Sequence, residues 1–162
     1  MARNVRKYVV CEDVLEYQLT VEQDEEWENN LRIYSDVVVK PGATLRVSCQ
    51  IYMQPGARII VERGGRLILS EDAIIANGEE CSDDHFSKWR GVTVEGNNAI
   101  PHNPAYANES YVITASDHGI VLLQEGSTLR DARTGIECLR YNETWNSGYW
   151  GAYINARGVN FL

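Results

Sequence analysis

An internal repeat constrains the fold of this chain more than any other feature of its sequence. Residues 36–57 and 58–80 carry two copies of one pattern, in which equivalent positions lie 22 residues apart. The aligned pairs are Val37 with Ile59, Val39 with Val61, Gly42 with Gly64, Leu45 with Leu67, and Met53 with Ile75. A period of this size is typical of a solenoid, in which each unit buries its apolar face against the next one.

Each copy reads as three short strands separated by sharp corners. In the first copy the strands are expected at residues 37–39, 44–47 and 51–53, with Pro-Gly or Gly-Gly at the corners. Alternation along a strand places Leu45 on the same inward face as Leu67 one turn later. The pattern therefore predicts triangular turns of a parallel β-helix, with glycine supplying the left-handed backbone conformation of the corners.

The repeat continues into the second half of the chain, where longer segments interrupt it. Val94 takes the position of Val61 after 33 residues, and we assign Leu123 to the same position after 62 residues. The segment 126–129 then matches the corner at 42–45. Such excursions leave a solenoid at its corners. They are expected at residues 77–88, 97–111 and 140–150.

The predicted fold is all-β: a parallel β-helix of about four turns over residues 36–162. Residues 1–35 lack the repeat, and we expect them to form an N-terminal cap and entry segment, because a first turn without cover exposes unpaired strand edges. Whether the cap is a helix or added strands stays open, and Trp27 is expected to anchor it. The sequence stops inside a turn, so we interpret it as the N-terminal piece of a longer β-helix.

Charged residues alternate with the apolar ones along the expected strands. Alternation of this kind is typical of a sheet with one solvated face. We therefore expect these side chains on the solvated outside of the coil: Arg46, Arg58, Glu62, Arg66 and Arg130.

Charge and hydropathy exclude two classes of partner. The formal net charge is −8. Nucleic acids and anionic membranes attract basic surfaces, so neither is expected to bind this chain. No apolar run approaches the roughly 18 residues of a membrane-spanning helix, the longest uncharged hydrophobic piece being residues 120–123. No membrane insertion is expected.

The four cysteines do not form a metal motif. Cys11, Cys49, Cys81 and Cys138 lie far apart, without a Cys-x-x-Cys pair or a histidine at zinc spacing. We therefore predict no metal site and no cofactor. Cys49 and Cys138 are expected in or near the stack as small apolar residues, and Cys11 and Cys81 as the more exposed pair. The sequence does not choose among the three disulfide pairings.

Four segments in order resemble one known family. They are Glu-Glu-Trp-Glu-Asn-Asn (25–30), Val-Val-Val-Lys-Pro-Gly-Ala-Thr-Leu (37–45), Ala-Arg-Ile-Ile-Val-Glu-Arg-Gly-Gly-Arg-Leu-Ile-Leu (57–69) and Lys-Trp-Arg-Gly-Val-Thr-Val-Glu-Gly (88–96). Together they look like the right-handed β-helix, pectin-lyase-like domain of large secreted Bacteroidetes proteins, often exported by type IX secretion. The resemblance covers about residues 25–162. It implies an extracellular or cell-surface location, with a signal peptide that this sequence does not contain.

The fold invites a search for polysaccharide-cleaving residues. Inverting glycoside hydrolases use paired carboxylates roughly 6.5–9.5 Å apart, and lyases need calcium-binding acids and a base. The weak catalytic candidates are Asp83, Asp84, His85, Asp117 and His118. Because these residues are not expected on one sheet of adjacent turns, we predict no catalytic activity in this chain.

The excursions are rich in aromatic residues. The candidate ligand-binding residues are Tyr141, Trp145, Tyr149, Trp150, Tyr106 and Tyr111. Exposed aromatic faces stack on sugar rings, while neighbouring amides orient the hydroxyls. Alternatively, the same rings fold back over the outer wall and stabilise the coil.

Two functions from different classes follow from these patterns. The first is a structural or binding module of a secreted or cell-surface protein, which presents its loops to carbohydrate or to a surface protein. The alternative is the N-terminal fragment of a polysaccharide-degrading lyase or glycoside hydrolase whose catalytic turns lie beyond Leu162. An acid cluster on one sheet would distinguish the second from the first.

Overall fold

The computed structural model describes residues 18–78, 88–138 and 151–162, which form three parallel sheets around one core. Sheet A consists of β1 (Leu19–Val21), β4 (Val37–Val39), β7 (Arg58–Val61), β10 (Gly91–Val94) and β13 (Ile136–Glu137). Sheet B consists of β2 (Glu25–Trp27), β5 (Thr44–Val47), β8 (Arg66–Leu69), β11 (Ile120–Leu123) and β14 (Tyr153–Ala156). Sheet C consists of β3 (Leu31–Ile33), β6 (Gln50–Met53), β9 (Ile74–Asn77), β12 (Thr128–Leu129) and β15 (Asn160–Phe161).

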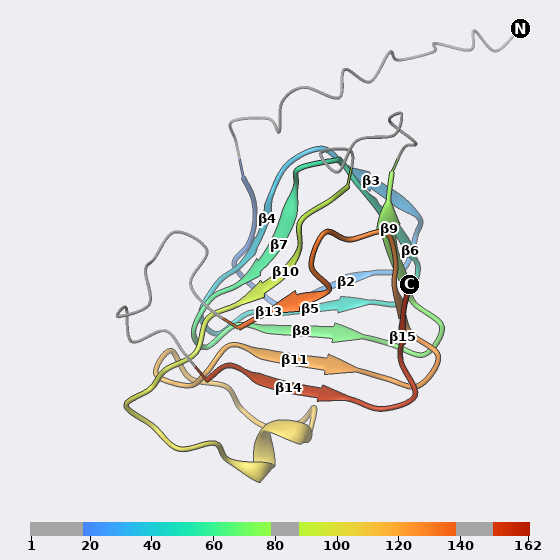
Figure 1. Ribbon diagram of the computed structural model, residues 1–162. Coiled ribbons are helices and arrows are strands. Elements are labelled where there is room, and N and C mark those ends of the chain that lie inside the picture. Colours follow the sequence, from blue (N-terminus) through green and yellow to red (C-terminus); the bar gives the residue numbers. More distant parts are fainter. Residues whose placement is uncertain (1–17, 79–87, 139–150) are drawn as a thin grey trace, which may run out of the picture.

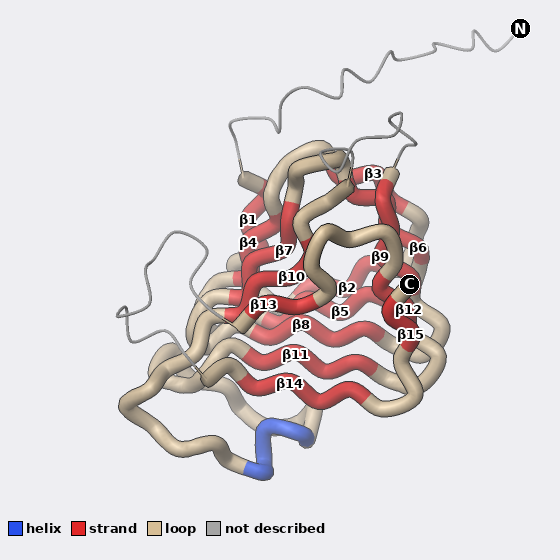
Figure 2. The backbone as a smooth tube through the Cα atoms, viewed as in Figure 1, coloured by secondary structure: helices blue, strands red, loops and turns tan. Residues whose placement is uncertain are grey.

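Every third strand returns to the same sheet, and all pairings are parallel, so the chain winds as a coil with three sides (Figure 1). This confirms the predicted all-β parallel β-helix. Figure 2 shows the strands stacked in layers, with the short helix η2 (Pro104–Ala107) outside sheet B, below β14 in this view. In the described residues, no helix is long and apolar enough to span a bilayer.

The coil begins earlier than the expected residue 36. Strands β1, β2 and β3 form a turn of their own and pair in parallel with β4, β5 and β6. This turn does not show the 22-residue repeat because its spacing is shorter: β1 pairs with residues 18 positions later, and β2 and β3 pair with residues 20 positions later. Val21 is fully buried, whereas Trp27 and Leu31 are only partly buried against the core. The described residues therefore form five turns, and Trp27 packs as part of the first one.

The predicted register holds for the first two sheets of the repeat. Val37 pairs with Ile59, and Leu45 pairs with Leu67. The third predicted pair is wrong, because Met53 lies opposite Asn77 and Ile51 lies opposite Ile75. The corner between β8 and β9 spans residues 70–73, two residues more than the corner between β5 and β6, at residues 48–49. The longer corner shifts the register on sheet C by two positions.

The register of the fourth turn also differs from the prediction. Leu123 lies on sheet B opposite Leu69, not on sheet A, and Leu129 lies on sheet C opposite Ile75. The match of residues 126–129 to residues 42–45 failed because residues with a left-handed backbone conformation occur at more than one corner of the coil. Gly126 has a φ of 80° at the corner where Asp72 has a φ of 60° one turn earlier. The excursion before β11 therefore lies within a turn, between sheets A and B.

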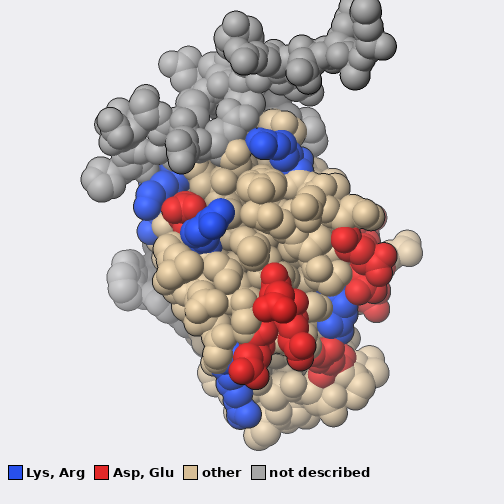
Figure 3. All heavy atoms as spheres, turned by 90° about the vertical axis from the view of Figure 1, so that its right-hand side faces the viewer, with Lys and Arg blue, Asp and Glu red and all other residues tan. Residues whose placement is uncertain are grey.

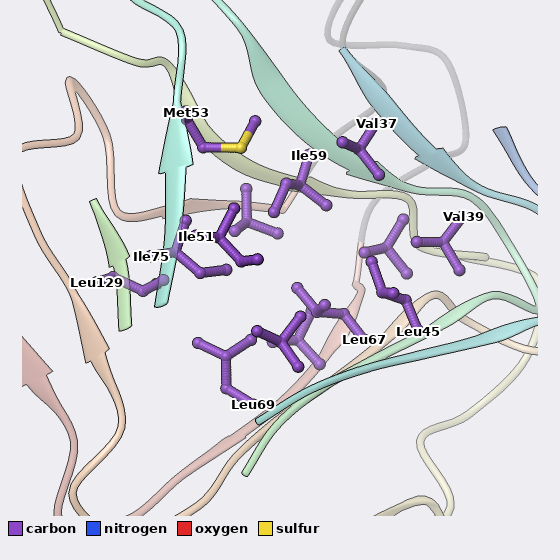
Figure 4. Close-up of a cluster of buried hydrophobic side chains, with 14 of the residues drawn as sticks. Val37, Val39, Leu45, Ile51, Met53, Ile59, Leu67, Leu69, Ile75 and Leu129 are labelled. Atoms are coloured by element: carbon purple, nitrogen blue, oxygen red, sulfur yellow. The ribbon is translucent and has the colours of Figure 1, made fainter. Parts of the chain in front are cut away.

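The interior of the coil is a column of aliphatic side chains. Figure 4 shows residues from all three sheets pointing toward one another, among them Leu45, Leu67 and Ile75. Like side chains stack in register from turn to turn, on sheets A and B as the repeat predicts and on sheet C with the shifted register. Cys49 packs against this column, as expected. Trp89 is fully buried beside it and donates its Nε1–H to the carbonyl oxygen of Arg130, at 2.8 Å.

Residues 95–119, which connect β10 to β11, form a covering loop on the outer face of sheet B. Tyr106 of this loop packs on the outward side chains of Ile68, Ile120 and Leu122, forming a second apolar cluster. This covering loop changes the environment of outward-facing residues that the sequence places in solvent. It also builds the candidate site.

Candidate functional site: a groove on the outer face of sheet B

Seven of the predicted site residues lie outside the described residues: Asp83, Asp84, His85, Tyr141, Trp145, Tyr149 and Trp150. The other four belong to the covering loop. They are Tyr106, Tyr111, Asp117 and His118. The structure brings these four together at sheet B, but most of them fasten the loop to the coil.

Tyr106 does not offer a free ring for a ligand. Only 2% of its surface is exposed, and its ring contacts those of Tyr111 and Tyr153 edge-on, at centroid distances of 5.2 and 5.5 Å. Burial, together with the hydrogen bond to Asp117, raises the pKa of Tyr106 to about 12. The alternative expectation, in which an aromatic ring folds back over the wall, describes Tyr106. Tyr111 is only partly buried and borders open space.

Asp117 organises the end of the covering loop. Its carboxylate accepts hydrogen bonds from the Tyr106 hydroxyl at 3.1 Å, from the Thr114 amide at 2.7 Å and from the Thr114 hydroxyl at 3.0 Å. The residue is buried. A carboxylate with its oxygens occupied in this way serves to anchor the loop, because little of it remains to receive a substrate proton.

His118 ties the same loop to the start of β14. Its ring is 2% exposed and stacks on that of His102, with centroids 4.6 Å apart, while His102 Nε2 lies 2.7 Å from the carbonyl oxygen of Gly151. The Nδ1 atom of His118 accepts the backbone N–H of Asn97 at 3.0 Å. Burial, followed by the charge of His102, lowers the pKa of His118. The neutral ring therefore carries its proton on Nε2.

The covering loop leaves a hollow of about 530 Å³ over the first three strands of sheet B. Its floor is the outer face of β2, β5 and β8, and one wall is the segment 109–113. We name this hollow the upper groove. Its charged lining comprises four carboxylates and two guanidinium groups: Asp24, Glu25, Glu26, Glu109, Arg46 and Arg66.

The two arginines of the upper groove hold its wall in place. Arg66 is 3% exposed, and its Nη1 and Nη2 atoms donate to the carbonyl oxygens of Glu109 at 2.8 Å and Tyr111 at 2.6 Å. Burial lowers the pKa of Arg66. Arg46 Nη2 donates to the Glu109 carboxylate at 2.5 Å, which lowers the pKa of Glu109. The expectation that Arg66 is a solvated surface charge is wrong, because the covering loop lies on it.

Arg58 corrects the same expectation at another corner. It is buried, its amide N–H donates to Asp36 Oδ1 at 3.0 Å, and its Nε lies 3.8 Å from Asp36 Oδ2. Burial raises the pKa of Asp36 to about 6, against the opposing charge of Arg90. A carboxyl group with such a pKa is a candidate proton donor. Asp36 precedes β4 on sheet A, however, and does not line the upper groove.

The described residues contain no cluster of three or more histidine, cysteine or acidic side chains arranged to hold a metal ion. Charge on the face seen in Figure 3 is scattered, with small acidic and basic groups separated by uncharged surface. In the upper groove itself, the lining residues offer hydrogen bonding and local charge, beside one partly exposed tyrosine ring.

Sequence reasoning missed Asp24, Arg46, Arg66 and Glu109 as site residues. Arg46 and Arg66 were recognisable as outward-facing positions of sheet B, since each alternates with a buried leucine. Nothing local marks Glu109, because its role depends on where the covering loop folds. Comparisons of the chain with models of protein families, with curated proteins and with solved structures found no match.

Proposed function

We propose that this chain is a carbohydrate-binding module of a secreted or cell-surface protein and that the upper groove binds a neutral glycan. The observation that carries the proposal is the groove itself. A hollow of about 530 Å³ is in the size range of small-ligand sites, and it lies on a rigid sheet whose central strands are paired on both sides.

The lining suits a ligand rich in hydroxyl groups. Arg46 supplies donors, Glu26 and Asp24 supply acceptors, and Ser110 supplies both. Tyr111 borders the same space and provides a partly exposed aromatic ring for the carbon face of a sugar. Carboxylates outnumber guanidinium groups in the lining, so a polyanionic glycan would be repelled.

Binding is better supported than cleavage. A general acid at neutral pH needs a raised pKa, whereas Arg46 lowers the pKa of Glu109. Two other acids of the groove already accept hydrogen bonds within the coil: Asp24 Oδ1 from the Thr44 amide of the next turn at 2.8 Å, and Glu25 Oε2 from Trp27 Nε1–H of the same strand at 3.2 Å. The alternative is a polysaccharide-degrading lyase or glycoside hydrolase.

The resemblance to pectin-lyase-like domains of secreted Bacteroidetes proteins supports an extracellular location for this module. It also agrees with a role in presenting a binding surface within a larger assembly. A surface protein is the other partner that such a module would contact.

The test is titration of the purified chain with soluble neutral polysaccharides, including mixed-linkage glucan, xyloglucan, mannan and arabinan, followed by calorimetry. We expect saturable binding that Arg46→Ala weakens at least about tenfold, since a hydrogen bond to a charged group contributes roughly 1.5–3 kcal/mol. Arg130→Ala is the matched control, because Arg130 also pairs with a carboxylate, Asp131, at 3.2 Å but lies outside the groove.

Three results would contradict the proposal. One is the absence of binding to every neutral polysaccharide. Another is equal weakening of binding by both substitutions. The third is shortening of the polysaccharide during the titration, with new reducing or unsaturated ends, which would favour the enzyme alternative.

A further inference from the structure

The covering loop closes the upper groove on the side of the C-terminal turns. There the loop packs on β8 and β11, where Ile68 is 1% exposed and Leu122 is 4% exposed beneath Tyr106. A second hollow of about 470 Å³ lies beyond this contact, toward β14, and is lined by Gln124 and Asn155, among others. We name it the lower groove. Buried side chains therefore separate the two grooves, and a ligand that follows the coil axis would meet the loop at β8.

The wall of the upper groove follows the direction of β8. At one end of the wall, the Glu109 carboxylate accepts hydrogen bonds from Arg46 Nη2 and from Gln124 Nε2, just after β11. At the other end, the backbone oxygen of Thr114 lies so close to the corner before β8 that a Cβ atom at Gly64 would collide with it. The wall therefore extends antiparallel to β8 over the whole length of the strand.

The exposed part of the floor carries two pairs of polar side chains, on β2 and β5. Glu26 lies opposite Arg46 in the register, and the Thr44 amide donates to Asp24 Oδ1 at 2.8 Å. The pair of Asp24 and Thr44 lies at the start of the two strands, and the other pair lies two residues further along them (Figure 1). Two residues of a strand span about 6.6 Å. A chain parallel to the strands therefore meets one pair after the other.

Val112 is an apolar residue of the wall without a packing role in the coil. It lines the upper groove, it is 81% exposed, and it belongs to neither apolar cluster of the described residues. Its neighbours Tyr111 and Ile113 pack against the second apolar cluster, and Arg66 binds the Tyr111 carbonyl oxygen. Val112 is thus held at a fixed place beside the groove. An aliphatic side chain in water gains free energy when the carbon face of a ligand covers it.

We propose that the upper groove binds a glycan segment lying across the coil, parallel to the strands of sheet B, and that Val112 contacts the carbon face of a sugar ring. The inference rests on the proposed function and adds the orientation of the ligand, its length and a binding residue. β5 contains four residues and is about 13 Å long, the span of roughly two to three sugar units. The hydroxyls of successive units face the two polar pairs of the floor.

The first experiment measures the affinity of neutral oligosaccharides by calorimetry. The probes are di-, tri-, tetra- and hexasaccharides of the polysaccharides named above. They are titrated into the whole chain and into Val112→Ala and Val112→Trp. Leu162→Ala is the matched control, since Leu162 is 74% exposed and lines neither groove. Asn155→Ala tests the lower groove.

We expect the affinity to rise from the disaccharide to the trisaccharide and then to stay level. Val112→Ala should weaken trisaccharide binding about fivefold, because less apolar surface is covered by the ligand. Val112→Trp should strengthen it about twofold, since an indole ring offers a larger face for stacking. Leu162→Ala and Asn155→Ala should leave it unchanged. Because Val112 is exposed, neither of its variants should change the midpoint of thermal unfolding, which separates a contact with the ligand from a structural role.

The second experiment determines the orientation of the ligand. A trisaccharide with a nitroxide at its reducing end broadens the NMR signals of nearby amides. A ligand across the coil places the label at one end of the sheet B strands. We therefore expect the strongest broadening either around Gly42 and Gly64 or around Ser48 and Ser70, which flank β5 and β8. Broadening centred over β11 and β14, or on β2 alone, would indicate a ligand along the coil axis and overturn the inference.

Two further results would overturn the inference and leave the proposed function in place. In the first, oligosaccharides bind and Arg46→Ala weakens binding, but Val112→Ala does not. In the second, Asn155→Ala weakens hexasaccharide binding as much as Val112→Ala does, so that the ligand reaches the lower groove. If neither polysaccharides nor oligosaccharides bind the chain, the proposed function fails together with the inference.

Discussion

The inside of the coil and the outer face of sheet B each carry an apolar cluster, but the two clusters are built in different ways. Inside, an aliphatic side chain of each turn packs against the equivalent side chain of the previous turn, as Leu67 packs against Leu45. Outside, Ile68 and Leu122 are covered by Tyr106, which comes from a loop that occurs in one turn only. The interior is repetitive and local, whereas the outer cluster depends on one long insertion.

The comparison explains how a solenoid gains a binding site without losing its stack. The covering loop enters at a corner, and β10 and β11 on either side of it keep the register of the preceding turn. The strands therefore carry the stability, and the loop determines which outward side chains are buried and which line a groove. Leu67 and Ile68 are adjacent on one strand, but Leu67 belongs to the interior cluster and Ile68 to the outer cluster.

The largest effect is expected for a charge inside the coil. Leu67→Asp buries a carboxylate in the aliphatic column, where no partner compensates it, and should cost more than about 4 kcal/mol of unfolding free energy. That is a large part of the stability of an ordinary domain. Circular dichroism should show loss of the native spectrum. Retention of a native spectrum with cooperative unfolding would contradict the inward position of Leu67.

Two alanine substitutions on β8 compare the contributions of the interior cluster and the outer cluster to the free energy of unfolding. Leu67→Ala leaves a cavity in a rigid stack and should cost about 3 kcal/mol. Ile68→Ala should cost about 1–2 kcal/mol, because the covering loop can move into the space. Urea unfolding measures both values. Loosening of the covering loop is followed by hydrogen exchange of the Tyr111 amide, which donates to the Asn108 carbonyl oxygen at 2.9 Å. Its exchange rate should rise in Ile68→Ala but not in Leu67→Ala. A rise in both variants would show that the interior cluster and the outer cluster open together.

The attachment of the covering loop is tested by removing one hydroxyl at a time. Tyr106→Phe removes the hydrogen bond to the buried Asp117 carboxylate and should cost about 1–2 kcal/mol. Tyr111→Phe removes a longer contact, 3.4 Å, from a partly exposed ring and should cost at most about 0.5 kcal/mol. Thermal unfolding provides both values. Equal losses of stability would show that the Tyr106 hydroxyl contributes no more to holding Asp117 than the Tyr111 hydroxyl does.

The smallest effect is a pH dependence confined to the covering loop. The pKa of His118 is lowered in the closed loop, so the opened loop binds the proton more readily, and closure weakens as pH falls below about 6.5. Asp36 acts in the opposite sense on global stability, since its pKa is raised to about 6 and its protonation favours the fold as pH falls. A local probe is therefore required.

The Asn97 amide, which donates to His118 Nδ1, is that probe. Its hydrogen exchange, corrected for the intrinsic pH dependence of exchange, should accelerate relative to that of β8 amides between pH 7 and pH 5. In His118→Asn the acceleration should disappear. An unchanged ratio of Asn97 to β8 exchange in the unmodified chain would show that the ring does not titrate with loop opening.

The site shows where sequence reasoning stops. Arg66 alternates with Leu67, and alternation predicts that it faces outward, which it does. Its burial depends on Glu109 and Tyr111, more than 40 residues later, whose carbonyl oxygens it binds. No local pattern contains that information. For the same reason, Tyr106 is recognisable as an aromatic loop residue but not as a buried one.

The sequence by itself determined the parallel coil, its three strands per turn and the register of its first two sheets. These features follow from alternation, corner glycines and a constant period, which act between residues close in the chain. Only the tertiary structure decided the additional turn at the N-terminal end, the corner at which the covering loop enters, and the pairing of Glu109 with Arg46 and Gln124. The length of each corner and the docking of a unique loop depend on contacts between distant segments, and a repeat contains no record of those contacts.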